Sequence, residues 1–409
     1  MSARRSRGAR RLAVAAFLAV AAVLSVRAWI HLDASDAVGG VQWAMGDFRD
    51  AVYYPAVALL EGRNPYDTAG FRRYPIEKAF PLYLPASPAL HVGFGLLPYR
   101  ASQACYFVLT LALTVLLARS ALGLAGARVT MASVWAFAAL LLASRPGHVN
   151  LLLGQVTAQV VLATYVALRH ARERSWLAAA ALAVALCKPT TGVPLALLLL
   201  FGWGDLRAVV AGGAAAGIVS LAAIARMAHE QGPAAFVASL GGSYGDFQSD
   251  GMVNAATSLT RVDAAAVLAR VAGHAVAGGI ELGLLLGVVG LGTFGVRRAL
   301  ARGGASGQRT AVGLACLTIL VCAYHQAYEV LLVAVPVASL AAGTGPRALR
   351  WPLLALIALP LVNYAGTWTT IRWLDLGPTG TALATVVNGL ALLAAWGGYL
   401  WAAVRGGDA

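Results

Sequence analysis

The sequence has few charged residues and almost no lysine. Of its 409 residues, 12% are Asp, Glu, Lys or Arg and 59% are hydrophobic. A soluble domain usually carries roughly twice that charged share. Long apolar runs recur along the whole chain and leave no room for a large soluble domain, so we expect an all-α polytopic membrane protein.

Nearly all of the positive charge comes from arginine, because Lys78 and Lys188 are the only lysines. The net charge of +14 would suit a nucleic-acid binder. However, the arginines punctuate the ends of apolar segments, which is typical of the cytoplasmic links of membrane proteins. We therefore expect membrane lipids as partners and no nucleic acid.

Several common kinds of site are also absent. The four cysteines (Cys105, Cys187, Cys316 and Cys322) stand in or beside apolar runs without the spacing of a metal site. We expect them to be small core residues, and we expect no metal. The sequence contains no P-loop and no HExxH motif, which excludes the enzyme classes that depend on them.

Apolar runs long enough to cross a bilayer predict about twelve transmembrane helices. We interpret the first as a retained span rather than a signal peptide. The fifth and sixth are short, so this pair is either two separate spans or a single bent or re-entrant hairpin. The predicted spans are 12–32, 99–119, 129–144, 149–168, 176–187, 190–203, 208–226, 275–296, 310–323, 326–344, 351–371 and 380–404.

The charges orient these spans. Arginines gather in the short links that share a side with the N-terminus, so we expect both termini in the cytoplasm. Eleven of the 17 acids fall in two long links, 33–98 and 227–274, which we expect to be extracytoplasmic. The preference for arginine over lysine, with abundant Ala and Gly, suggests a bacterial plasma membrane protein. We expect a single domain over 1–409.

The first long link carries two apolar segments of its own. In GDFRDAVYYPAVALLEG, the apolar residues recur at helical spacing, which predicts an interfacial amphipathic helix that ends before Pro65. The segment 84–98 is too short to span, so we interpret it as a second interfacial or half-inserted helix.

Three positions stand out as candidates for chemistry. Asp47 begins the amphipathic helix and is either an ordinary N-cap or a general base. Lys188 follows an apolar run and needs a partner or a water-filled cavity at membrane depth, unless it snorkels. His325 and Glu329 have the spacing of one helix face, with Tyr328 adjacent, and form either a site or a local pair that holds helices together.

Other polar residues allow two interpretations each. Gln155, near the Arg145–His148 junction, either lines a cavity or bonds helices together, and we favour the second role. Arg72 and Arg73, with Lys78, contact either a phosphate group or lipid headgroups.

Several of these pieces stand in an order that resembles glycosyltransferase family 87, a family of GT-C type membrane enzymes. They are GDFRDAVYYPAVALLEGRNPYD after the first span, a helix ending in Leu-Leu-Pro at 96–98, NLLLGQV at 150–156, ALAVALCKPTTGVPL and YHQAYEVLL. One departure is Ile76 after Tyr74-Pro75, where the family often has Tyr-Pro-Pro. That loop often borders the acceptor, so the acceptor stays open.

The resemblance implies a GT-C-like bundle and an inverting hexosyltransferase that moves mannose, or another sugar, from a polyprenyl-phosphate donor. The acceptor would be a lipid or glycan on the extracytoplasmic face, and no cofactor would be needed. By position, Asp47 would be the general base, Lys188 would neutralise the leaving phosphate, and His325 would hold either the donor phosphate or the acceptor. Glu329, Tyr328, Gln155, Arg72 and Arg73 complete the expected substrate-binding set.

Two other functions remain open from the sequence. A transporter or flippase would also place polar residues at membrane depth, although no internal repeat is evident. A non-catalytic scaffold predicts that Asp47, Lys188 and His325 do not converge.

Overall fold

The computed structural model describes residues 3–32, 44–229, 231–251 and 253–406, which are helical almost throughout and contain no strand. Six helices are long and apolar enough to cross a membrane, which makes the chain a multi-pass membrane protein. They are α1 (Ala3–Ile30), α7 (Tyr99–Leu124), α13 (Leu206–Met227), α16 (Gly278–Ala301), α17 (Gly304–Cys322) and α21 (Gly377–Arg405).

Shorter apolar helices account for most of the remaining predicted spans. α8 (Met131–Ala143) and α9 (Arg145–Leu153) are bent by 75° and count as a seventh span if taken together. The others are α10 (Thr157–His170), α11 (Ser175–Leu186), α12 (Pro189–Leu197) with the π-helical η2 (Leu198–Trp203), the 3-10 helix η3 (Ala327–Val333) with α18 (Ala334–Ala342), and α19 (Arg350–Val362).

Two predicted continuous spans are interrupted. The predicted span 149–168 breaks at Gly154, which has a left-handed φ of 70° and ends α9. The predicted span 351–371 ends at Asn363 and is followed by the short η4 (Tyr364–Gly366) and α20 (Trp368–Leu374). Arg145 stabilises this second break, because its guanidinium donates to the carbonyls of Asn363 (3.2 Å) and Gly366 (2.8 Å). Arg145 therefore bonds helices together rather than lining a cavity.

The core of the bundle surrounds α17. In its apolar window 72% of residues are buried, against 28% for α1, α13 and α16. Those three outer helices expose large apolar side chains such as Leu18, Leu221 and Leu286. Because lipid tails are apolar, such a surface suits a bilayer. Three cysteines are buried as expected, but Cys105 is exposed on α7, so its assignment to the core was wrong.

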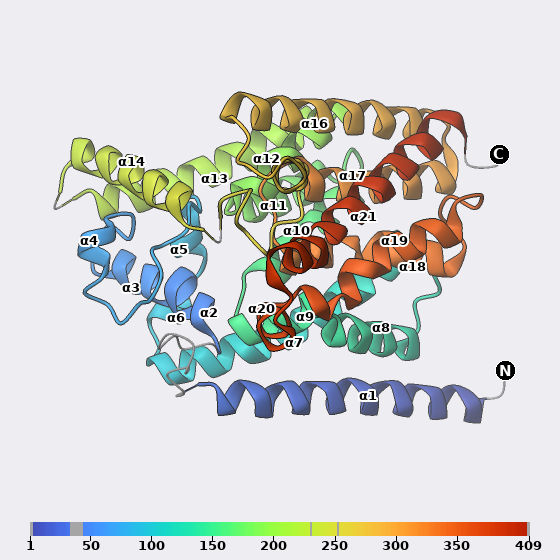
Figure 1. Ribbon diagram of the computed structural model, residues 1–409, viewed down its shortest axis with the longest axis horizontal. Coiled ribbons are helices and arrows are strands. Elements are labelled where there is room, and N and C mark those ends of the chain that lie inside the picture. Colours follow the sequence, from blue (N-terminus) through green and yellow to red (C-terminus); the bar gives the residue numbers. More distant parts are fainter. Residues whose placement is uncertain (1–2, 33–43, 230, 252, 407–409) are drawn as a thin grey trace.

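The polar segments gather at one end of the molecule. In Figure 1 the start of α1 and the end of α21 lie at the right. The helices of the first polar link and α14 (Pro233–Ser249) lie at the left. The first link contains α2 (Gly46–Phe48), the π-helical η1 (Arg49–Tyr53), α3 (Tyr54–Leu60), α4 (Thr68–Phe71), α5 (Ala86–Leu90) and α6 (Val92–Gly95), and the second continues into α15 (Ala264–Ala272).

The predicted helix after Gly46 is confirmed, with a π-helical turn inside it. Phe48, Val52, Ala56 and Leu59 are all buried, as their spacing predicted. The segment 84–98 is two short helices, α5 and α6, that meet at His91.

A buried ion pair connects two parts of the first link. The Arg49 guanidinium donates to both oxygens of Asp50 (2.7 and 3.1 Å), and Asp50 also accepts from the backbone N–H groups of Glu77 and Lys78. Burial raises the pKa of the Asp50 carboxyl, against the opposing effect of its hydrogen bond from Arg49. This pair holds the 77–78 loop against the helix that carries Asp47.

Candidate functional site

Lys188 occupies a break between two helices. α11 ends at Leu186, Lys188 is in extended conformation, and Pro189 is the first residue of α12. Proline suits that first position, because its fixed φ matches the helix and its missing N–H would have no helical partner there. The Cys-Lys-Pro sequence therefore places the lysine side chain at an interruption inside the bundle.

The Lys188 ammonium forms an ion pair with Glu329, with 2.6 Å between Nζ and Oε1. Their side chains are only 5% and 4% exposed. An unpaired charge at such a depth would be very costly, so the carboxylate meets the expected need for a partner. The rings of Tyr83 and Tyr328 lie 5.7 and 5.1 Å from the ammonium, within cation–π range.

Glu329 has a second contact that fixes its direction. Its other oxygen accepts from the backbone N–H of Gln326 at 2.6 Å, in a capping box at the start of η3. One carboxylate thus starts a helix and holds the lysine. The Tyr328 carbonyl accepts from the Asn150 side chain (2.8 Å), which ties this turn to α9.

His325 lies before η3 in non-helical backbone, so the predicted helical pairing with Glu329 was wrong. The histidine is fully buried. Its Nδ1 lies 3.0 Å from the Ala323 carbonyl oxygen, which can only accept, so Nδ1 is the donor of this contact. Its Nε2 lies 3.3 Å from the Thr191 hydroxyl on α12. Because α12 begins directly after Lys188, this contact places His325 next to the lysine break.

Two small cavities flank Lys188. Each has a volume of about 10 Å³, roughly the space of one water molecule. The inner walls of the first include Lys188, Thr157, Thr191, His325 and Glu329. This cavity brings three of the predicted site residues together, along with two hydroxyls that the sequence did not mark.

The second cavity extends the polar environment toward the first link. It is lined by Lys188, Tyr83, His91 and Gln159, among others. His91 Nε2 lies 2.9 Å from the Gln159 side-chain oxygen, and burial lowers the pKa of His91. These residues carry no sequence signal, because a lone His or Gln in an apolar segment is usually structural.

Asp47 is not a helix cap, because Met45 precedes α2 in left-handed conformation and no side chain caps it. Instead the half-buried Asp47 carboxylate accepts a hydrogen bond from the Gln155 side chain. Gln155 follows the break at Gly154, and its carbonyl accepts from the Tyr106 hydroxyl at 3.2 Å. Through this contact with Asp47, Gln155 joins α2 to the break between α9 and α10, in line with the favoured role of bonding helices together.

The Tyr83 side chain lies near Lys188 and within electrostatic range of Asp47. Burial raises the pKa of the Tyr83 phenol, and the negative charges of Glu329 and Asp47 raise it further. The backbone after it docks on the lysine break, where Leu84 N donates to the Cys187 carbonyl at 3.1 Å. The charges of Glu329 and Asp47 therefore both act on the Tyr83 hydroxyl, while the Tyr83 ring lies near the Lys188 ammonium.

The remaining predicted residues lie elsewhere. Arg72 and Arg73, at the end of α4, are exposed and make no side-chain contact with the residues around Lys188. Among the residues that the structure describes, no cluster of three or more His, Cys, Asp or Glu side chains could hold a metal ion.

Comparison with known proteins identifies one family. Residues 82–324, more than half of the chain, match the sequence model of glycosyltransferase family 87. Lys188 and Gln155 lie inside the matched range, whereas Asp47 precedes it and His325 follows it directly. No curated protein and no solved structure matches the chain.

Proposed function

Because the chain belongs to glycosyltransferase family 87, we propose that it transfers a hexose, with inversion, from a polyprenyl-phosphate donor to a lipid or glycan acceptor. Mannose is the sugar that we expect. The reaction would take place at the extracytoplasmic face of a bacterial plasma membrane and would need no cofactor.

One observation carries the proposal: the Tyr83 ring lies 5.7 Å from the buried Lys188 ammonium, and its phenol is close enough to the Asp47 carboxylate to be influenced by that charge. Asp47 and Lys188 come from segments far apart in the sequence, yet both act on this one side chain. An inverting transfer needs a base on one side of the reacting carbon and a positive charge near the leaving phosphate on the other. A scaffold would have no need to bring the two groups to one place.

In the proposed reaction, the acceptor hydroxyl oxygen attacks the anomeric carbon and the bond from that carbon to the phosphate oxygen breaks. The hydroxyl proton passes to Asp47, which Gln155 orients. The leaving phosphate takes the bonding electrons, and Lys188 balances the charge that develops on it. His325 donates no proton in this scheme but helps to place the phosphate.

The proposed membrane arrangement places the chain termini and the reacting residues on opposite sides of the membrane. We place both termini in the cytoplasm, take the shorter apolar helices as additional spans toward about twelve, and set α2 to α6 at the outer interface. The end that carries these segments lies opposite the chain termini in Figure 1. The polyprenyl chain would stay in the bilayer while the sugar phosphate reaches Lys188.

The proposal is tested by transfer from polyprenyl-phosphate mannose with the purified full-length protein. We expect Asp47→Asn to lower kcat roughly 10²- to 10⁴-fold, because a positioned general base contributes that much. Asp67→Asn is the matched control, since Asp67 lies on the same link, where it caps α4 and accepts from the Gln231 side chain at 3.5 Å. Equal activity of wild type and Asp47→Asn would remove Asp47 as the base.

A transporter remains the second candidate, on the strength of two helix interruptions. The chain is broken at Gly154 and again at Lys188, and broken helices form the binding sites of many transporters. Donor-independent uptake of a lipid-linked sugar into proteoliposomes, without transfer, would favour this function.

A further inference from the structure

Within the second polar link, residues 253–263 lie against the segment that contains His325, near Lys188. Arg261 and Gln326 form an isolated antiparallel bridge. Val262 N donates to the His325 carbonyl (2.9 Å), and Ala327 N donates to the Thr260 carbonyl (2.7 Å). The backbone on both sides of Gln326, including the His325 carbonyl, is therefore held by a segment of the second polar link.

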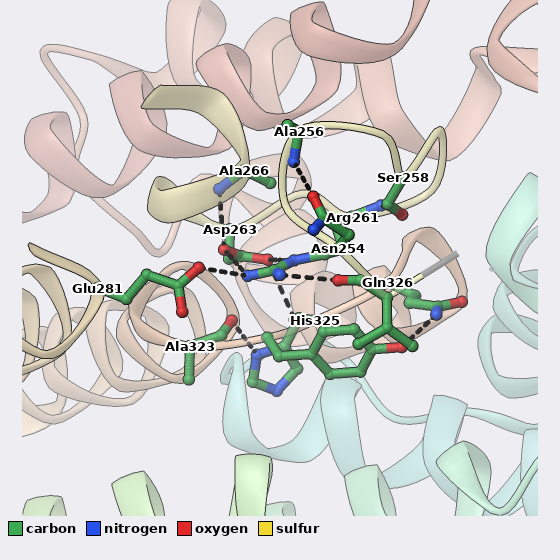
Figure 2. A network of polar contacts seen from close by, with 12 residues as sticks. Asn254, Ala256, Ser258, Arg261, Asp263, Ala266, Glu281, Ala323, His325 and Gln326 are labelled. Carbon is green, nitrogen blue, oxygen red and sulfur yellow. Dashed lines mark hydrogen bonds and ion pairs between the residues drawn. The ribbon is translucent and has the colours of Figure 1, made fainter. Parts of the chain in front are cut away.

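A buried ion pair lies at the centre of this contact, as Figure 2 shows. The Arg261 guanidinium donates to both oxygens of Asp263, at 2.9 and 2.8 Å, and to the Val253 carbonyl at 2.8 Å. Arg261 is 6% exposed and Asp263 is fully buried. Glu281, at 4.0 Å from the guanidinium, lies at the outer edge of the network.

Two routes lead from this pair to the Lys188 site. On the first, an Asp263 oxygen accepts from the backbone N–H of His325 at 3.4 Å. On the second, Arg261 lies over the Tyr324 ring at 5.1 Å, and the Tyr324 hydroxyl accepts from the Gln326 side chain. The backbone of Gln326 then holds Glu329, the partner of Lys188.

Local stability alone does not account for this arrangement. Asp263 caps α15 by accepting from Ala266 N (3.1 Å), but Asn or Ser would cap a helix equally well without a buried charge. A buried ion pair is often no more stabilising than apolar residues of the same volume. The paired charges instead supply directed contacts to the segment that contains His325.

We propose that Arg261 and Asp263 are positioning residues that set the orientation of His325 and Glu329 for the transfer reaction. The pair touches no reacting atom in this scheme. Its effect passes through the Tyr324–Gln326 backbone, and the proposal rests on the proposed function of the Lys188 site.

The kinetic test compares Asp263→Asn and Arg261→Lys with wild type. Small misplacements of reacting groups are costly, so we expect kcat to fall roughly 10- to 100-fold. The KM for donor should change less, because no binding group is removed. Asp205→Asn is the matched control, since Asp205 is also a buried N-cap, of α13, and accepts from Ala208 N (3.1 Å) and the Ser175 hydroxyl (2.9 Å). Asp205→Asn should keep the wild-type kcat even where it lowers thermal stability as much.

Amide hydrogen exchange of residues 323–329 supplies a measurement that does not depend on activity. We expect faster exchange there in Asp263→Asn and Arg261→Lys than in Asp205→Asn. Unchanged exchange, or faster exchange with an unchanged kcat, would overturn the proposal. If exchange rises while the wild type itself transfers no sugar, the proposed function fails and the structural coupling stands.

Discussion

At the scale of single residues, Lys188 shows what a sequence can and cannot predict. Its position beside Pro189 in an apolar run indicated that the charge needs a partner, and the structure provides Glu329. The identity of that partner was not predictable, because it depends on how two distant segments pack. The same is true of Gln155, whose contact with Asp47 appears only in the folded chain.

The ion pair predicts an unusual effect of removing a carboxylate. In the proposed reaction the donor phosphate must compete with Glu329 for the Lys188 ammonium. We therefore expect Glu329→Gln to lower the KM for donor, because glutamine still accepts from Gln326 N but carries no charge that competes for the ammonium. The loss of one competing hydrogen bond should lower this KM roughly 3- to 10-fold.

Steady-state kinetics at fixed acceptor concentration would measure this change. Lys188→Met should raise the same KM, and Glu61→Gln, an exposed carboxylate that accepts from Tyr74, should leave it unchanged. A higher donor KM in Glu329→Gln would mean that Glu329 binds the donor itself.

At the scale of elements, the positions of most helices follow from apolar runs, whereas their interruptions do not. A Gly-Gln pair inside 149–168 hardly lowers local hydropathy, yet Gly154 ends α9 there. The spacing of His325 and Glu329 fits a helix, but the backbone at His325 is held by the bridge between Arg261 and Gln326, a tertiary contact. Local patterns cannot report such contacts.

The break at Gly154 predicts a specific loss of stability. Its φ of 70° disfavours any L side chain, and an added Cβ would lie 2.6 Å from the Phe48 Cβ. We expect Gly154→Ala to destabilise the protein by roughly 1–3 kcal/mol and to lower activity, because α2 with Asp47 packs on this turn.

Thermal unfolding in detergent, with transfer assayed in parallel, would check this expectation. Gly213→Ala is the matched control, since this glycine lies inside α13 with open space where an added Cβ would lie. Alanine has the better helix propensity there, so Gly213→Ala should be neutral or slightly stabilising. A stable, active Gly154→Ala would show that the turn tolerates a side chain.

At the scale of the whole molecule, the polar segments and the chain ends lie at opposite ends of the bundle (Figure 1). Composition alone predicted a polytopic helical protein, because so few charged residues leave no other class. The number of spans was harder to predict, since short and broken helices inside a bundle have the same composition as full spans.

The orientation can be tested by cysteine labelling in a Cys105→Ser background, because Cys105 is the exposed cysteine of the described part. Ala69, on α4, and Gln308, on α17, are both exposed. A membrane-impermeant maleimide should label Ala69→Cys in intact spheroplasts and Gln308→Cys only after lysis. The reverse pattern would place the proposed site on the cytoplasmic face.

The narrow cavities beside Lys188 have a consequence for how tightly the protein holds any sugar. Each is about 10 Å³, far too small for a sugar ring, so the arrangement described here is a closed one. In the proposed reaction, donor entry would therefore have to separate Tyr83 and η3 from the lysine break before any contact forms. The measured affinity is then the affinity of the opened state reduced by the fraction of molecules that are open.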